Sequence, residues 1–312
     1  MSAVAGDIVV RLMGGLANQI FQYAAGRAIA SARGCRLRLD LSHFSDPGEF
    51  RRFALDAYAF NAGIFPWPTK VRWDRHVVTA ALTGRELRAL ARSSPLRAVR
   101  RLLSPDSWRE RPLVAEAGFD FDPAVAAAPP GSYLLGYFQS ERYFAAIAEE
   151  MRATFRAPRI VDATNRDWLA RIAAAHAVAV HVRRGDYLNP VTAARHGVCS
   201  AGYFRAAIAT MRARVPGATF FAFSEDRDWV RETLAAPDLV VVDANGPDAA
   251  AQELMLMAAC RHHVIANSSL SWWGAWLAAA PGQLVIAPTP WFGEPTPTPD
   301  LLPRQWMTLA RE

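Results

Sequence analysis

Lysine is almost missing from this sequence of 312 residues, although the formal net charge is +6 and the pI is about 9.6. Lys70 is the only lysine, so arginine supplies nearly all of the positive charge. The planar guanidinium of arginine suits bidentate recognition of phosphate. We therefore expect these arginines to bind a small phosphorylated ligand or an anionic lipid surface, and we expect no nucleic-acid partner.

Cysteine is scarce as well, and long apolar runs are absent. Cys35, Cys199 and Cys260 lie far apart and none is in CxxC spacing, which excludes a disulfide framework and a structural zinc site. A reducing compartment follows as the simpler expectation. The N-terminus lacks a basic start followed by a long apolar run, and no stretch reaches ~18 apolar residues, so we expect no signal peptide and no transmembrane helix.

Several enzyme signatures are also missing. The sequence has no GxxxxGK[ST] loop and no GxGxxG after a strand, which excludes a P-loop NTPase and counts against a dinucleotide oxidoreductase. It has neither GxSxG nor HExxH, the signatures of α/β-hydrolases and zinc proteases.

What the sequence does have is an alternation of strand and helix patterns. "DIVVRLMGG" predicts a strand, "LANQIFQYAAGRAIASARG" a helix ended by Gly34, and "CRLRLDL" a second strand. Further on, "YLLGYF" predicts a strand, residues 140–155 a helix, and "FRAPRIVDATNRDW" a crossing between domains. Apolar residues make up 52% of the chain, enough for two cores. We therefore predict two α/β domains, 1–160 and 161–312.

The second domain shows the alternation most clearly. Strands are expected in "AVAVHVRR", "TFFAFS", "LVVVD", "HVIAN" and "LVIAP", and helices near 201–214, near 227–235, in "AQELMLMAACRH" and in "SLSWWGAWLAA". This order predicts a doubly wound parallel sheet.

The arginine-rich segment at about 70–112 breaks the pattern, with leucines at helical spacing and a break at Pro95. It reads either as a basic amphipathic helical pair on an anionic membrane or as a solvated helical insertion that packs its leucines on the domain. We favour the insertion.

Polar clusters follow four of the predicted strands. "HVRRGDY", Ser224–Asp226 and Asn267–Ser269 lie in the second domain, and "GGLANQ" lies in the first. Ligands of open α/β sheets bind beyond the carboxyl ends of the strands. The four clusters therefore predict a cleft between two α/β domains.

Arg183 is the leading phosphate ligand. Side-chain alternation puts it on the same face as His181 and turns Arg184 away. The alternative is an interdomain ion pair of Arg183 with Asp186 or another acid, but His181 before it and Gly185 after it favour the ligand. Ser268 or Ser269 caps a helix or, through free amides at the helix start, binds phosphate. The tryptophans at 272, 273 and 276 are expected to be core. A metal-independent nucleotide-sugar glycosyltransferase fits these features, since protein cations can stabilise a departing diphosphate.

Several quoted stretches occur in an order that resembles a known family. "GGLANQIFQYAAGRA", "GYFQSERYF", "HVRRGDY", "FSEDRDWV", "ELMLMAACRHHVIANSSLSWWGAWL" and "VIAPTPWF" look like the bacterial α-1,2-fucosyltransferases of glycosyltransferase family 11, over roughly residues 8 to 292. The resemblance implies a GT-B fold, with two Rossmann-like domains facing a central cleft. The N-terminal domain would be the acceptor side, and the C-terminal domain would bind the donor.

The resemblance also implies the reaction. The donor would be GDP-L-fucose and the acceptor a β-galactoside, fucosylated at its 2-hydroxyl with inversion and without a metal or cofactor. A galactose-terminated oligosaccharide or lipid-linked glycan of O-antigen or surface glycan synthesis would be the partner. The location would be cytoplasmic, with peripheral contact to the inner membrane as an option.

Site residues are carried over from the same resemblance. His181 would contact the guanine side and Arg183 the β-phosphate, with Asp186 as the candidate base or as a group that orients Arg183 or Arg184. Asp226 would contact guanine or ribose, and the "GGLANQ" loop would close over the pyrophosphate. The full set of donor-binding residues is Gly15, Asn18, His181, Arg183, Arg184, Ser224, Asp226, Asn267, Ser268 and Ser269.

Three positions depart from the family pattern. Ala17 stands where glycine is usual, Glu225 replaces an aspartate, and the helix that usually starts with aspartate starts with Gln252–Glu253. Two alternatives stay open: a transferase of another linkage or GDP-sugar, and a non-catalytic glycan-binding protein on the same scaffold. Competition between GDP-sugars for the enzyme tests the first alternative. Binding of a glycan without release of GDP would identify the second.

Overall fold

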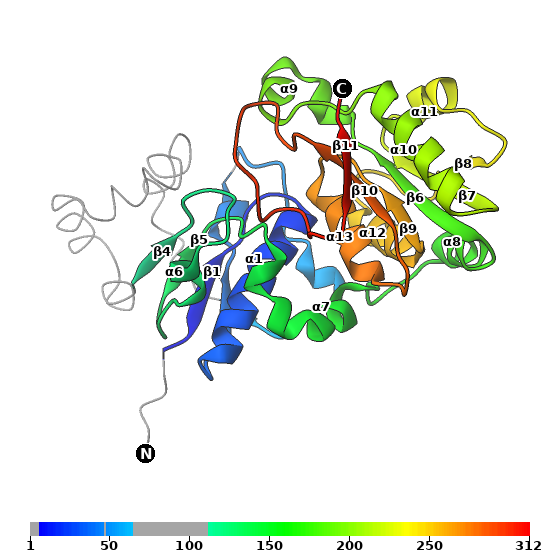
Figure 1. Cartoon of the computed structure of the whole chain (residues 1–312). Helices are drawn as coiled ribbons and strands as arrows, with labels where there is room; N and C mark the ends of the chain where they lie inside the picture. Colours follow the sequence, from blue (N-terminus) through cyan, green and yellow to red (C-terminus); the bar gives the residue numbers. More distant parts are fainter. Residues whose placement is uncertain (1–5, 47, 65–111) are drawn as a thin grey trace. The chain divides into compact units, whose positions relative to one another are not determined.

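The computed structural model describes residues 6–46, 48–64 and 112–312, which form two compact units, each built on its own sheet (Figure 1). The first unit comprises the described residues up to 56, with 60–148 and 299–301, and the second comprises 57–59, 149–298 and 302–312. The predicted boundary between residues 160 and 161 stays a prediction. The arginine-rich segment predicted at about 70–112 lies almost wholly outside the described residues.

The first unit contains a five-stranded parallel sheet in the order β3-β2-β1-β5-β4. Its elements are β1 (Ile8–Arg11), α1 (Leu16–Ala32), β2 (Leu37–Asp40), β3 (Gly63–Ile64), β4 (Leu113–Ala115), α6 (Pro123–Ala126) and β5 (Tyr133–Leu135). Single 3-10 turns occupy Ser42–Ser45, Leu55–Ala57, Glu141–Tyr143 and Ala145–Ile147. The predicted strand–helix–strand start is therefore confirmed.

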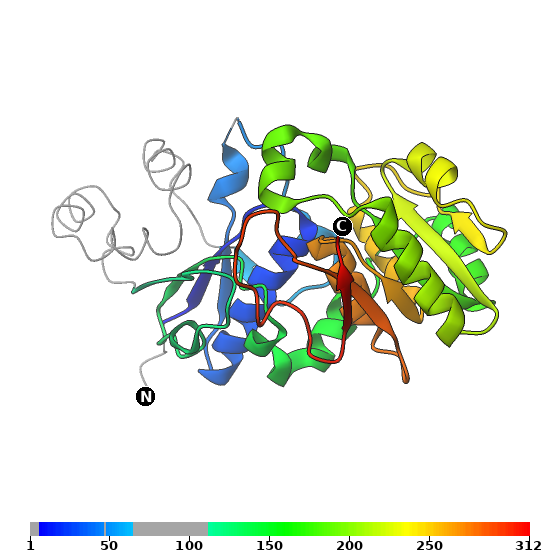
Figure 2. The same cartoon turned by 45° about the horizontal axis from the view of Figure 1, so that its top comes forward.

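Helix α1 packs directly on this sheet (Figure 2). A Cβ on Gly26 would lie 2.3 Å from a methyl of Val10 and 2.9 Å from a methyl of Leu37, so glycine lets the helix backbone come this close to β1 and β2. Gly34, at φ +62°, follows the helix in the left-handed conformation that glycine favours. The predicted end of the helix at Gly34 is confirmed.

The second unit contains a six-stranded parallel sheet in the order β11-β10-β9-β6-β7-β8. Its strands are β6 (His176–Val182), β7 (Ala218–Ser224), β8 (Leu239–Val241), β9 (His262–Val264), β10 (Val285–Thr289) and β11 (Met307–Ala310). Its helices are α7 (Ala148–Phe155), α8 (Ala163–Ala173), α9 (Pro190–His196), α10 (Ala201–Arg214), α11 (Arg227–Thr233), α12 (Ala250–Ala259) and α13 (Ser269–Ala278), with a 3-10 turn at Gly185–Leu188. The alternation predicted for this half is confirmed.

The central strand β6 is buried on both faces. Val178, Val180 and Val182 pack in one core cluster with Tyr203 and Phe204 of α10. The alternate residues face the other side, where Trp168 of α8 meets Phe221 of β7 edge to face at 6.4 Å. His181 therefore points away from α10, toward the side of the sheet covered by α8.

One prediction about the connections was wrong. Residues 140–155 are not one helix, because Phe144 at φ −130° separates the 3-10 turn Glu141–Tyr143 from the turn and helix that follow. The stretch expected as the domain crossing contains the start of α8, which Asp162 caps by accepting a hydrogen bond from the Asn165 amide at 2.8 Å. Its role as the crossing stays a prediction.

The strand β11 near the C-terminus was not predicted; it pairs in parallel with β10. Within the described ranges, none of the helices combines the length and apolar character needed to cross a membrane.

Candidate functional site

Three predicted polar clusters belong to one sheet in the second unit. Strands β6 and β7 pair in register as far as Val182 and Ser224, so Arg183 and Glu225 are the next residues of adjacent parallel strands. Strand β9 lies on the other side of β6, and Asn267 follows it. The carboxyl edge of this sheet therefore gathers all three clusters.

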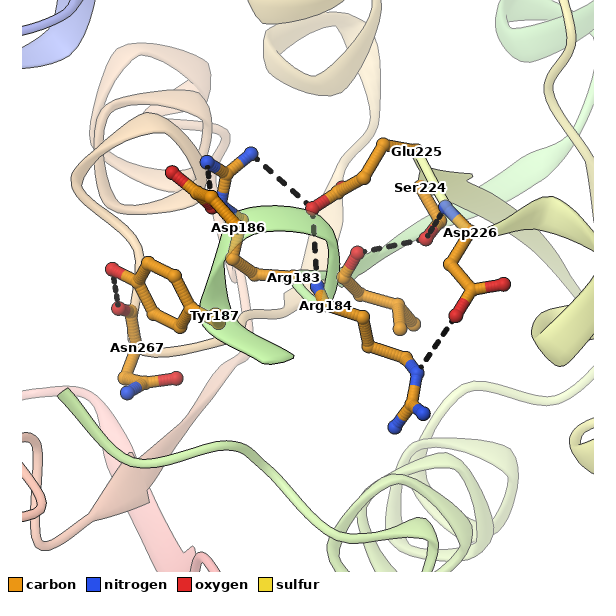
Figure 3. A network of polar contacts seen from close by, with 9 residues as sticks. Arg183, Arg184, Asp186, Tyr187, Ser224, Glu225, Asp226 and Asn267 are labelled. Atoms are coloured by element: carbon orange, nitrogen blue, oxygen red, sulfur yellow. Dashed lines mark hydrogen bonds and ion pairs between the residues drawn. The ribbon is translucent and has the colours of Figure 1, made fainter. Parts of the chain in front are cut away.

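Arg183 lies among acids at this edge. Its guanidinium donates to Asp186 at 2.5 Å and is 3.3 Å from Glu225, with 25% of its side chain exposed. Figure 3 shows the Glu225 carboxylate between the Arg183 guanidinium and the backbone of Arg184, whose amide donates to it at 3.1 Å. The alternative interpretation of Arg183 named these acids, but the ion pairs lie within the second unit, and they fix a partly exposed guanidinium at the strand end.

Arg184 points elsewhere. Its Nε donates to Asp226 at 3.0 Å and its guanidinium lies 4.3 Å from the ring centre of Trp229. Gly185 makes the crowded turn possible, because a Cβ there would lie 2.6 Å from the Glu225 carboxylate. The two neighbouring arginines therefore have different environments, and only Arg183 contacts Asp186 and Glu225 through its side chain.

Ser224 and Asp226 have structural contacts. The Ser224 hydroxyl donates to the carbonyl of Val182 at 2.9 Å and accepts from the Asp226 amide at 3.0 Å. Asp226 caps α11 by accepting from the Trp229 amide at 3.2 Å. These bonds fix β7 to β6 at the edge, and the roles of both residues in donor binding stay predictions.

His181 is buried, with 3% of its surface exposed, and its Nδ1 has no hydrogen-bond partner among the described residues. Burial, with a smaller contribution from the Arg183 charge, lowers the pKa of His181 to about 3. The imidazole is therefore neutral at neutral pH. An orphaned buried nitrogen is unusual in a folded protein and is typical of a position that a ligand completes.

Buried neutral histidines make the fold sensitive to acid. Burial also lowers the pKa of His263 to about 4. The unfolded chain takes up a proton at each as pH falls through about 6.5, whereas the folded chain does not until near 3 or 4. Stability should therefore fall by about 2 kcal/mol per histidine between pH 7 and pH 5, measured by urea unfolding.

The variant His263→Gln cannot take up this proton and should lose about half of the pH difference, whereas His176→Gln, at an exposed position, should keep all of it. Equal stability at the two pH values in the unmodified protein would contradict the assignment of both histidines as neutral.

The side-chain amide and the backbone carbonyl of Asn267 are both hydrogen-bonded within the protein. Its side-chain amide donates to the carbonyls of His196, Gly197 and Trp291 at 2.7, 3.2 and 3.1 Å. Its backbone carbonyl accepts from the Tyr187 hydroxyl at 3.3 Å. Burial raises the pKa of Tyr187 to about 12, so this donor stays protonated. Asn267 thereby joins three loops at the carboxyl edge.

The start of α13 offers unused donors. Ser268 is the N-cap residue, yet its side chain makes no capping hydrogen bond, and acidic residues are absent from the first turn. Ser268 is buried and Ser269 is partly buried. The expected alternative, a serine that caps this helix, is therefore not realised by Ser268, and the first amides of a ten-residue helix remain suited to an anion.

Glu253, in the first turn of α12, is a further acid of this region. Burial, and next the charge of Glu225, raise the pKa of Glu253 to about 7, while Arg227 and Arg183 oppose the rise. The site therefore holds one carboxyl group that is partly protonated at neutral pH. The sequence marked this position only as a departure from a pattern.

The "GGLANQ" loop belongs to the first unit. Gly14 has φ +75° and Gly15 is the N-cap residue of α1. The Asn18 side-chain oxygen accepts from Gln139 at 2.9 Å. Gln19 donates to the carbonyls of Gly14 and Arg52 at 2.9 and 2.8 Å and accepts from the Ala54 amide. Sequence reasoning missed Gln19, whose polar side chain inside an apolar helix was the available signal.

Gln22 has a similar function one turn later. It is fully buried, accepts from the Met13 amide at 3.0 Å and donates to the Gly136 carbonyl at 3.2 Å. The two glutamines together fix the conformation of the loop. The donor-binding roles of Gly15 and Asn18 stay predictions.

Comparison with known proteins gives a family match. The model of "Glycosyl transferase family 11" matches residues 113–307. The chain is 30% identical over 312 residues to an alpha-1,2-colitosyltransferase of Escherichia coli, covering 97% of this chain and 99% of that protein. It is 36% identical over 120 residues to the O-antigen biosynthesis glycosyltransferase WbnK of Escherichia coli, covering 38% of this chain and 40% of that protein.

A solved structure supports the fold. A mutant of Arabidopsis thaliana FUT1 in complex with GDP aligns with a TM-score of 0.51 at 10% identity, covering 91% of this chain and 71% of that chain. At this identity the likeness concerns the fold alone. Together with the two parallel α/β sheets, it confirms the predicted GT-B type of fold with two Rossmann-like domains.

Proposed function

Because this chain belongs to glycosyltransferase family 11, we propose that it transfers L-fucose from GDP-L-fucose to the 2-hydroxyl of a β-galactoside, with inversion at the anomeric carbon. Similarity over nearly the whole length to a transferase that forms an α-1,2 linkage is the observation that carries the proposal. An acceptor in O-antigen or surface glycan synthesis is part of it, supported by the relative named for O-antigen biosynthesis.

The donor is proposed to bind at the carboxyl edge of the second sheet. Arg183 binds the β-phosphate. The backbone amides at the start of α13, next to Ser268 and Ser269, bind the other phosphate of the diphosphate. The nucleobase side lies toward His181, whose Nδ1 lacks a partner. Arg184, Ser224, Asp226 and Asn267 complete the donor site on this unit.

The chemical step is an in-line displacement with oxocarbenium character. The C–O bond between fucose and the β-phosphate breaks, its electron pair goes to the phosphate oxygen, and the acceptor oxygen bonds to the anomeric carbon. Arg183 and the α13 amides stabilise the charge that develops on GDP. Asp186 accepts from Arg183 at 2.5 Å, and this contact favours the role that orients Arg183 over the role of base.

The donor sugar has one specific alternative to fucose. The full-length relative is named for transfer of colitose, a sugar that lacks the 3-hydroxyl of fucose. Arg183 and the first amides of α13 are suited to a diphosphate whichever of the two sugars it carries. GDP-colitose is therefore the alternative donor, with the same linkage.

GDP release tests the proposal directly. We expect release from GDP-fucose that depends on lactose or N-acetyllactosamine and persists with EDTA, since protein cations stabilise the leaving group. Release from GDP-colitose alone would retain the linkage and change the donor. Glycan binding without GDP release or GDP affinity would identify a non-catalytic protein and refute the proposal.

A further inference from the structure

Two phosphate-binding elements of the proposed donor site follow neighbouring strands of the second sheet. Arg183 comes directly after β6, and Ser268, the N-cap residue of α13, comes shortly after β9. One diphosphate can meet both elements only if their spacing is fixed, because a misplacement of about 1 Å can cost about 100-fold in rate. A side chain that joins the two elements would therefore control the geometry of the site. Tyr187, in the 3-10 turn Gly185–Leu188, is such a side chain.

The ring of Tyr187 packs against two side chains. Its centre lies 5.3 Å from the guanidinium carbon of Arg183, within the range in which an aromatic ring attracts a cation. The ring is also stacked on the imidazole of His196, with the ring centres 5.2 Å apart and the planes at 18°. The imidazole lies in turn 5.9 Å from the ring of Phe292. The ring that contacts Arg183 is thus held in place by neighbouring aromatic groups.

The hydroxyl of Tyr187 reaches the other phosphate-binding element. It donates to the backbone carbonyl of Asn267 at 3.3 Å (Figure 3), and Asn267 is followed directly by Ser268 at the start of α13. The side-chain amide of Asn267 donates to the carbonyl of His196 at 2.7 Å. Tyr187, His196 and Asn267 therefore form a closed set of contacts that ties the turn after β6 to the start of α13.

The local sequence brings the two stacked rings together. Asn189 caps α9 and Pro190 occupies its first turn. Gly197, at φ +73°, follows the last helical residue, His196. A helix of seven residues has little stability of its own, so α9 depends on contacts such as the stack with Tyr187. The turn and the helix are thus a compact unit whose two ends meet at these rings.

We propose that Tyr187 is a positioning residue of the donor site, which holds the Arg183 guanidinium at a fixed distance from the first amides of α13. The hydroxyl gives its proton to a backbone carbonyl, so Tyr187 acts through its neighbours and not on the reacting atoms. This inference rests on the donor site of the proposed function, and every residue in it belongs to the second unit.

Two substitutions separate the ring from the hydroxyl. Tyr187→Phe keeps the ring beside Arg183 and loses the hydrogen bond to Asn267, so the kcat of transfer should fall about threefold. Tyr187→Leu loses the ring as well, which frees the guanidinium to move, and kcat should fall about 30-fold. Leu188→Ala is the matched control, because Leu188 lies in the same turn, is 50% exposed and should leave kcat unchanged.

A double-mutant cycle shows whether the ring acts through Arg183. The ratio of kcat between Tyr187→Phe and Tyr187→Leu measures the effect of the ring, and it should be about tenfold when Arg183 is present. In the Arg183→Ala background the same ratio should fall to within about twofold, since the ring has no guanidinium to hold. A merely structural ring would give equal ratios in both backgrounds. Tyr187→Met, which keeps an apolar side chain without the ring, replaces Tyr187→Leu if that variant does not fold.

Ligand affinity gives a readout that does not need sugar transfer. Tyr187→Leu should lower the affinity for GDP about tenfold and leave the affinity for guanosine unchanged, because guanosine lacks the diphosphate that Arg183 and α13 would bind. Both affinities are measured by calorimetry or by competition with GDP. A general loosening of the unit would lower both together.

The outcomes separate this proposal from the proposed function. Equal ratios in the two Arg183 backgrounds, or an equal loss of affinity for GDP and guanosine, overturn the role of Tyr187 and leave the proposed function intact. If the unmodified protein binds GDP but transfers no sugar, the proposed function is wrong, and the same cycle run on GDP affinity still decides the role of Tyr187. If it does not bind GDP, both proposals are wrong.

Discussion

Replacing Arg183 with alanine is expected to lower kcat by about 10²–10³, or about 3–4 kcal/mol of transition-state stabilisation, the effect of removing one preorganised donor from a developing oxyanion. The guanidinium is fixed by Asp186 and Glu225 before the donor binds, so it needs little reorganisation to meet the phosphate. The measurement is kcat at saturating donor and acceptor, together with GDP affinity by calorimetry.

The Arg183→Ala variant should also bind GDP more weakly. Without Arg183, Asp186 and Glu225 lose the guanidinium that they contact beside the expected diphosphate, so GDP affinity should fall as well. Adding Glu225→Gln to Arg183→Ala should recover part of that affinity, because one negative charge is removed. Glu225→Gln alone should lower GDP affinity less than Arg183→Ala does, since Arg183 and its ion pair with Asp186 remain.

The matched control is Arg212→Ala. Arg212 forms an exposed bidentate pair with Asp238 at 2.7 and 2.9 Å, at the amino end of β8 and not at the carboxyl edge of the sheet, and its loss should leave turnover unchanged. Arg183→Lys should be intermediate, since lysine keeps the charge and loses the planar fork. Turnover of Arg183→Ala near that of the unmodified protein would show that the phosphate assignment is wrong.

The second unit was predictable because its sequence repeats one simple pattern. Strand β6 (His176–Val182) is a buried and mostly apolar run, and most of the helices between the strands begin after a polar N-cap residue. The connections were harder. The helix expected at 140–155 has periodicity but also Phe144, a buried ring whose non-helical backbone no local pattern reveals. Strand β11 of the second unit was not predicted, and it pairs in parallel with β10.

The candidate site divides in the same way. His181 lies near the end of β6, and Arg183 and Ser268 follow strands, so a rule about strand ends finds them. Gln19 and Gln22 were missed because their roles depend on burial and on partners far along the chain. Only the structure shows that both side chains are fully buried.

Asn267→Ala is expected to destabilise the fold by about 3 kcal/mol, because its side-chain amide donates to three backbone carbonyls, of which that of His196 also accepts from Arg311 at 3.5 Å. The carbonyls belong to His196, Gly197 and Trp291, so the loops after α9 and β10 should loosen together. Urea unfolding measures the loss, and Asn61→Ala, at an exposed position, should change stability by less than about 0.5 kcal/mol.

The same variant separates two roles for Asn267. If the residue acts on the donor through the loops it joins, Asn267→Ala should lower stability, and GDP affinity measured well below the melting temperature should change only modestly. If the amide instead contacts the donor directly, GDP affinity should fall steeply while stability hardly changes. Because the amide already donates to three carbonyls, it has no proton left for a phosphate, and the first result is the one the geometry requires.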